Sequence, residues 1–189
     1  MRKTRAFVAV VVPDEVVVFL RQIQAQLQLP GMNIRWVAAK NIHLTLKFLG
    51  DIDPSRVPEV AAQMDAAAGR APSFSLAAKG VGVFPNLRRA RVLWVGLAGD
   101  LDRLKAIQAT LESGLESVGF RRESRNFGAH LTIGRIRHRT DAEIINASLG
   151  QLKDTASDRF RVDRLVLFKS ILYPNGPEYT QLHASNLAV

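Results

Sequence analysis

Two near-identical tetrapeptides stand out in the sequence: HLTL at residues 43–46 and HLTI at residues 130–133. The chain has only four histidines, and each tetrapeptide begins with one of them. Two imidazoles that face a common space can act as general base and general acid near neutral pH, because the unperturbed pKa of histidine is about 6.5. Threonine hydroxyls beside them can hold the oxygens of a phosphate group. Four side chains are therefore candidates for phosphodiester chemistry: His43, Thr45, His130 and Thr132.

Other kinds of catalytic site lack their parts in this sequence. A metal site is disfavoured because the histidines show neither His-x-His nor His-x-x-x-His spacing and have no interleaved carboxylates. A serine or cysteine triad is disfavoured because the chain has no cysteine and no G-x-S-x-G motif. We therefore expect no metal and no cofactor.

Each tetrapeptide has the pattern of a β-strand that delivers the imidazole and the hydroxyl to the same face. Side chains alternate between the faces of a strand, so the histidine and the threonine project together while the two aliphatic residues point into a core. Strict alternation also puts Lys47 on the face of His43, where solvent exposure is as plausible as a role in the site, and puts Phe48 on the core side. Arg135 falls on the face opposite His130, unless Gly134 permits a bulge that turns it back.

Hydrophobic periodicity predicts an alternation of strands and helices around these motifs. Strands are expected at 5–12, 41–50, 74–84, 90–97, 129–136 and 160–170, with a hairpin turn at 173–179 before a last strand. Helices are expected at 13–28, 58–69, 100–118 and 141–152. The predicted class is α+β, with two pseudo-symmetric lobes. Each lobe is an antiparallel sheet with helices on its outer face, and a central cleft receives one H-x-T motif from each.

The composition is that of an ordinary globular chain. Of 189 residues, 47% are hydrophobic and 23% charged, and no linker divides them, so we expect one bilobal domain over 1–189. Pro13, Asp14 and Glu15 interrupt the apolar run near the start, and no stretch reaches the roughly 18 to 20 apolar residues of a membrane span. We expect a cytoplasmic monomer without membrane contact.

The formal net charge of +9 indicates polyanionic partners. A solubilising surface is the alternative for any one arginine cluster. The arginines gather in two stretches: Arg88, Arg89 and Arg91, and then Arg121, Arg122, Arg125, Arg135, Arg137 and Arg139 around the second motif. Contacts to RNA backbone phosphates are expected of Arg121, Arg122 and Arg137.

The paired motifs resemble the 2H phosphoesterase superfamily. The surrounding sequence resembles its bacterial LigT-like branch, the RNA 2′,3′-cyclic phosphodiesterases, also called 2′-5′ RNA ligases. Five segments carry the resemblance: RAFVAVVVP, NIHLTLKFLGDI, VGVFPNLRRARVLWVGL, FGAHLTIGRI and GPEYTQL. One departure is Ala129, where relatives usually have proline before the second histidine. We expect it to alter the rigidity of the strand entry and not the chemistry.

The resemblance implies roles for five residues: His43 and His130 as catalytic residues, and Thr45, Thr132 and Arg135 as phosphate-binding residues. It implies metal-independent opening of 2′,3′-cyclic phosphates at RNA ends or on nucleosides to give 2′-phosphates, with reversible 2′-5′ ligation as the reverse reaction. We expect His43 to be the acid and His130 the base, and the exchanged assignment stays open. A module of the same fold that binds nucleotides or RNA ends without turnover is the alternative function. His138 and His183 match no motif, and a structural role is at least as plausible for Tyr179 as one in the site.

Overall fold

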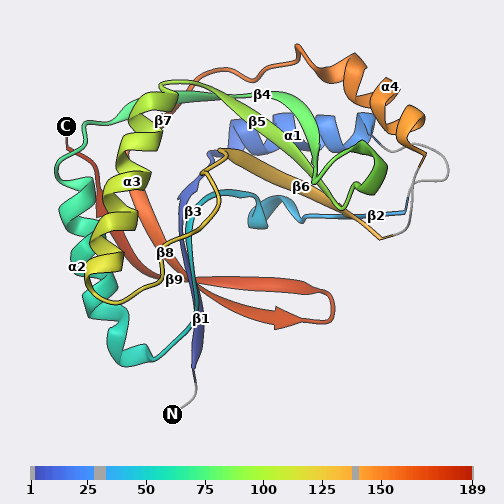
Figure 1. Ribbon diagram of the computed structural model, residues 1–189. Helices are drawn as coiled ribbons and strands as arrows, with labels where there is room; N and C mark the ends of the chain where they lie inside the picture. Colours follow the sequence, from blue (N-terminus) through green and yellow to red (C-terminus); the bar gives the residue numbers. More distant parts are fainter. Residues whose placement is uncertain (1–2, 28–32, 138–140, 189) are drawn as a thin grey trace.

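The strands of the protein form one antiparallel sheet (Figure 1). The computed structural model describes residues 3–27, 33–137 and 141–188, and within them the strand order is β7-β4-β5-β6-β3-β1-β8-β9, with β2 beside β6. The strands are β1 (Thr4–Val11), β2 (Ile34–Trp36), β3 (His43–Ile52), β4 (Phe74–Phe84), β5 (Val92–Gly99), β6 (His130–Ile136), β7 (Phe160–Val162), β8 (Arg164–Tyr173) and β9 (Gly176–Asn186). The helices are α1 (Asp14–Gln26), α2 (Val57–Ala68), α3 (Leu101–Ser117) and α4 (Ala142–Leu152), with 3-10 turns η1 (Ala39–Asn41), η2 (Pro54–Arg56) and η3 (Leu87–Arg89).

The sheet consists of two halves that meet at one place. Strands β3, β1, β8 and β9 form what we call the His43 half-sheet, and β7, β4, β5, β6 and β2 form the His130 half-sheet. Between the halves, β3 and β6 pair at Leu44 and Leu131. The α+β class and the two lobes predicted from the sequence are confirmed. The two half-sheets are joined edge to edge.

The helices exchange between the two halves. Helix α1 follows β1 of the His43 half-sheet but contacts β6, and α3 follows β5 of the His130 half-sheet but contacts β3. Helices α2 and α3 pack side by side over the His43 half-sheet, while α4 covers β4 (Figure 1). Each lobe therefore contains elements from both ends of the sequence. No helix in the described ranges is long and apolar enough to cross a membrane.

One predicted strand, 160–170, is in fact two. Its first residues form β7, which pairs with β4 at the outer edge of the His130 half-sheet. After Asp163 the chain continues as β8, which pairs with β1 in the other half. Phe160, Val162 and Leu165 are all buried, and the change of half-sheet falls at the two consecutive exposed residues Asp163 and Arg164. The short strand β2 was not predicted.

A β-bulge in β3 reverses the predicted positions of Lys47 and Phe48. Val8 pairs with Lys47 while the next residue of β1, Ala9, pairs with Thr45, so Leu46 is the extra residue. A bulge changes the alternation of side chains beyond it. Lys47 is consequently buried on the helix side, and Phe48, expected in the core, is 68% exposed.

The buried Lys47 joins β3 to α3 and to the segment that follows this helix. Its Nζ donates to the carboxylate of Glu112 and, at 2.6 Å, to the carbonyl oxygen of Arg121. The Glu112 carboxylate also accepts the backbone N–H of Glu123 at 2.6 Å and the side-chain amide of Gln108 at 3.3 Å. All the charge that β3 brings into the core is thereby paired and hydrogen-bonded.

Removing one member of this ion pair should be far more costly than replacing both. Lys47→Met leaves the Glu112 carboxylate buried without its cation, and we expect a loss of about 3 to 5 kcal/mol in the free energy of unfolding. Lys47→Met combined with Glu112→Leu should recover more than half of that loss, because no uncompensated charge stays in the core. Urea unfolding of the three proteins measures both values. A double variant no more stable than Lys47→Met would show that the uncompensated charge is not the source of the loss.

Candidate active site

The single pair between the half-sheets sets the position of both H-x-T motifs. Leu44 and Leu131 are corresponding residues of the two motifs, and they pair directly in antiparallel orientation. Both side chains are buried, at 1% and 0% exposure. The histidine and threonine of each motif are therefore on the opposite face of the sheet, where all four side chains are half-buried.

The register of this pair brings each histidine toward the threonine of the other motif. In an antiparallel register, the residue before Leu44 lies opposite the residue after Leu131, and the reverse holds on the other side. His43 is thus across from Thr132, and Thr45 is across from His130. The structure brings all four predicted side chains onto one face, as an anion-binding group with two imidazoles requires.

Both imidazoles are oriented by the same kind of backbone contact. The Nδ1 atom of His43 lies 2.8 Å from the carbonyl oxygen of Asn41, and that of His130 lies 2.7 Å from the carbonyl oxygen of Gly128. A carbonyl oxygen only accepts hydrogen bonds, so Nδ1 of each ring donates. Nε2 of each ring is left to exchange a proton with a substrate.

Aromatic rings enclose His43 and affect its protonation. Phe7 stacks on the imidazole with 4.7 Å between ring centroids, and Tyr179 meets it edge-on at 5.3 Å. Burial lowers the pKa of His43 below its usual value of 6.5; the carbonyl of Asn41 opposes this shift, and a positive charge on His130 adds to it. His43 therefore favours the neutral form, and the two imidazoles are close enough for their charges to interact.

His130 has an aromatic neighbour of its own on the other half-sheet, but it lies closer to solvent. The ring of Phe84 meets it edge-on at 5.0 Å, and the ring of Trp94 lies 5.2 Å from that of Phe84. Gly82 makes room for this arrangement, because a Cβ atom there would fall 2.2 Å from the Trp94 ring. The two histidines therefore have different surroundings, although their motifs are similar.

A second bulge decides where Arg135 points. In β6, Gly134 pairs with Leu93 and Thr132 pairs with Trp94, so Ile133 is the extra residue. Ile133 and Gly134 are both buried, and Arg135 is exposed. The bulge therefore returns Arg135 to the face of His130, as considered from the sequence.

The guanidinium of Arg135 lies within electrostatic reach of Tyr179. Burial raises the pKa of Tyr179, and the positive charge of Arg135 opposes that rise. Tyr179 in turn contacts His43 edge-on. The role of Arg135 as a phosphate ligand remains a prediction.

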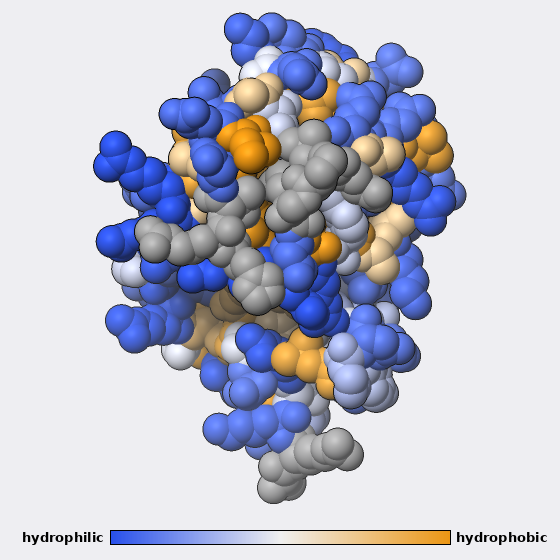
Figure 2. Space-filling view, turned by 90° about the vertical axis from the view of Figure 1, so that its right-hand side faces the viewer, coloured by the Kyte–Doolittle hydropathy of each residue, from blue (hydrophilic) through white to orange (hydrophobic). Residues whose placement is uncertain are grey.

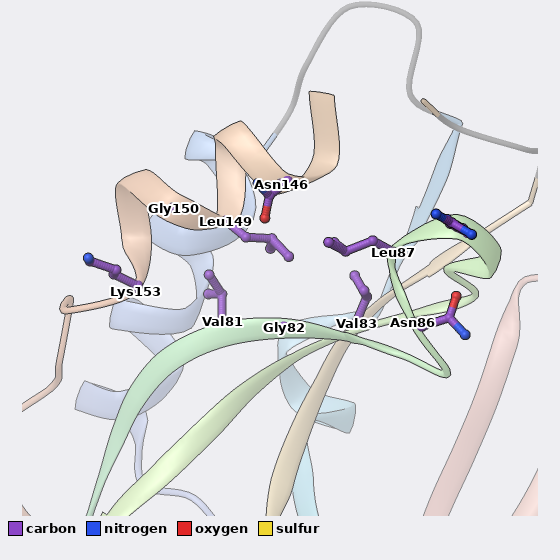
Figure 3. Close-up of a pocket in the computed structure, with 10 residues that line it drawn as sticks. Val81, Gly82, Val83, Asn86, Leu87, Asn146, Leu149, Gly150 and Lys153 are labelled. Carbon is purple, nitrogen blue, oxygen red and sulfur yellow. The ribbon is translucent and has the colours of Figure 1, made fainter. Parts of the chain in front are cut away.

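A pocket of about 260 Å³ opens beside His43. Val11, Phe168 and Tyr179 contribute apolar surface to its lining, and η1 contributes Lys40. A larger hollow of about 760 Å³ lies between α4 and the β4 end of the sheet, where Figure 3 shows aliphatic side chains converging. None of the predicted site residues lines that larger hollow.

The two remaining histidines are not part of this group. His183 donates through Nε2 to the Asp65 carboxylate at 2.8 Å, and Ser185 donates to the same oxygen at 2.7 Å, which ties β9 to α2. His138 lies outside the described residues. Within the described ranges, no three histidine or acidic side chains gather in a way that could hold a metal ion.

The fold and the repeated H-x-T motif are those of a phosphoesterase. The chain belongs to the LigT-like phosphoesterase family, whose model matches residues 10–94 and again residues 95–179, with one H-x-T motif in each match. The two matches bear out the internal repeat suggested by the motifs.

Relatives extend along nearly the whole chain. An RNA 2′,3′-cyclic phosphodiesterase of Thermotoga maritima is 34% identical over 95% of this chain and 93% of its own length. One of Methanothermobacter thermautotrophicus is 31% identical over 98% of this chain and all of its own length. Among solved structures, a Thermus thermophilus protein has a TM-score of 0.79 at 25% identity, covering 97% of both chains. Escherichia coli LigT in its apo form has a TM-score of 0.78 at 24% identity, covering 100% of both chains.

The interaction between the imidazoles should be visible in their titration. His130→Gln removes a positive charge that lowers the pKa of His43, so the pKa of His43 should rise in this variant. Nuclear magnetic resonance of the imidazole signals measures the shift, with His183→Gln as the control, because His183 contacts α2 and not the cleft. An unchanged pKa for His43 in His130→Gln would show that the two rings are not coupled.

Proposed function

We propose that the protein hydrolyses 2′,3′-cyclic phosphates at RNA ends or on nucleosides to 2′-phosphates, without a metal, by general acid and base catalysis from His43 and His130. The observation that carries the proposal is the pair of imidazoles on one face, each with Nδ1 held by a backbone carbonyl and Nε2 available. The relatives named RNA 2′,3′-cyclic phosphodiesterases support the choice of substrate.

The two imidazoles can carry out both proton transfers of the hydrolysis. One neutral imidazole takes a proton from water, whose oxygen attacks phosphorus. The bond between phosphorus and the 3′ oxygen breaks, and the second imidazole, which starts protonated, gives its proton to that oxygen. Thr45 and Thr132 bind the non-bridging oxygens and stabilise their growing charge.

The same residues can also catalyse attack by a nucleophile other than water. A 5′-hydroxyl that replaces water forms a bond to the same phosphorus, the bond to the 3′ oxygen breaks, and the product is a 2′-5′ phosphodiester. Both histidines come from one chain, so the proposal needs no second copy of the protein. We expect residues 1–189 to act as one unit, as a monomer in the cytoplasm.

The lowered pKa of His43 bears on which imidazole is the base. A base must start neutral, and a lower pKa keeps the neutral form populated to lower pH. His130 lies nearer to solvent than His43 does, and Phe84 is its aromatic neighbour. We therefore assign His43 as the base and His130 as the acid, the reverse of the assignment expected from the sequence.

Each histidine should be indispensable for turnover. His43→Ala and His130→Ala should each lower kcat on a nucleoside 2′,3′-cyclic phosphate by at least about 100-fold, because each loses a proton transfer of that value. Phosphorus NMR of the product measures turnover, in EDTA throughout, and circular dichroism checks that the variants fold. A variant that binds the substrate and retains more than a tenth of the activity would exclude the replaced histidine as the acid or the base.

The wild-type protein tests the rest of the proposal. Activity lost in EDTA and restored by Mg²⁺ or Zn²⁺ would exclude the metal-free mechanism. A wild-type protein that binds the substrate without turnover would favour the binding module.

A sulfur substitution distinguishes the acid from the base. A cyclic phosphate with sulfur in place of the bridging 3′ oxygen needs little help from an acid, because a thiolate leaves readily. On this substrate His130→Ala should regain most of its lost activity and His43→Ala should not. Rescue of His43→Ala instead would restore the assignment expected from the sequence.

A further inference from the structure

Arg35, which no motif singled out, lies directly across from Arg135. Strand β2 pairs with β6 in the register Arg35–Arg135, between the pairs Ile34–Ile136 and Trp36–Gly134. Both arginines are exposed, whereas the neighbours of Arg35 pack against the core. Directly paired residues of an antiparallel ladder project from the same face, so both guanidinium groups point toward the side of His130.

This arrangement is unfavourable for the protein by itself. Like charges at directly opposite positions of a sheet destabilise it. One cross-strand pair changes the stability of a sheet by roughly 0.2 to 1 kcal/mol. Among the described residues, the ion pairs include neither Arg35 nor Arg135. Two adjacent guanidinium groups without a carboxylate partner are suited to bind an anion.

Both arginines lie close to the hairpin of β8 and β9. Arg35 donates through Nη2 to the carbonyl oxygen of Pro174 at the hairpin tip, at 3.3 Å, and Arg135 lies near Tyr179 further along the hairpin. The arginine pair therefore lies between β2 and the hairpin, and Tyr179 of this hairpin also lines the pocket beside His43. The face of the molecule on this side is largely hydrophilic (Figure 2), which suits a polar ligand.

We propose that Arg35 and Arg135 form a second anion subsite, which binds the 5′-phosphate of the nucleotide whose cyclic phosphate lies between the two histidines. The proposal rests on the proposed function, because it takes the position of the cyclic phosphate from it. Thr132 and Arg135 are separated by roughly 10 Å along the strand. A ribose with its 5′-phosphate fits this span once the long arginine side chains are counted.

The choice of ligand follows from the chemistry of an RNA end. The 5′-phosphate is the next anion along the chain from a cyclic 3′ end, and a nucleoside 2′,3′-cyclic phosphate lacks it. Guanidinium groups bind phosphate oxygens through two parallel N–H donors. The subsite would therefore make the enzyme favour RNA ends over free nucleoside cyclic phosphates.

The test compares two substrates that differ only in this group: adenosine 2′,3′-cyclic phosphate with and without a 5′-phosphate. We expect wild-type kcat/KM to be at least about tenfold higher for the 5′-phosphorylated substrate, as charge-assisted hydrogen bonds imply. Arg35→Gln should reduce this ratio to near 1 without changing kcat/KM for the substrate that lacks the group. Arg35→Lys should retain part of the ratio, and high salt should diminish it in the wild type.

Arg161→Gln is the matched control, because Arg161 is an exposed arginine on β7 at the far edge of the sheet. It should keep the wild-type ratio. A wild-type ratio near 1, or a ratio that survives Arg35→Gln, would overturn the subsite. An equal loss on both substrates in Arg35→Gln would overturn it too, since it would mean that Arg35 acts by holding the hairpin. A wild-type protein that turns over neither substrate would instead contradict the proposed function.

Discussion

The backbone pairing of Leu44 with Leu131 is the contact that joins the two half-sheets, and the candidate site depends on it. Antiparallel pairing of corresponding residues relates the two motifs by a local two-fold rotation. The buried leucines hold the strands together from the helix side, so the opposite face receives two imidazoles and two hydroxyls at fixed positions. Because α1 and α3 each pack on the half opposite the strand they follow, the lobes are also tied together by the chain itself.

Symmetry of the backbone does not extend to the surroundings of the histidines. Phe7 and Tyr179 enclose His43, whereas Phe84 covers His130 from one edge only. Desolvation penalises the charged form of an imidazole, so the more enclosed ring is biased toward the neutral state. A repeat with one motif sequence can in this way place its two imidazoles in different environments.

The sequence was sufficient to predict the α+β class, the strand nature of both motifs and the shared face of each histidine and threonine. Strict alternation failed where bulges interrupt it, at Leu46 and at Ile133, because the extra residue depends on the partner strand and not on local sequence. The contacts that orient His43 and His130 come from backbone carbonyls, which every residue type has, so no side-chain pattern could reveal them. Arg35 was missed since β2 is short and its importance lies in the register with β6.

The order of strands also governs when the protein can fold during its synthesis. Strand β1 pairs with β3 on one side, but its other neighbour is β8, residues Arg164–Tyr173, near the opposite end of the chain. A nascent chain thus carries an apolar strand with one unpaired edge through most of translation. Such edges invite pairing with other chains, which makes the interval between the synthesis of β3 and that of β8 the period of greatest exposure to misassembly. The ribosome must release nearly the whole chain before the surface that carries His43 is complete.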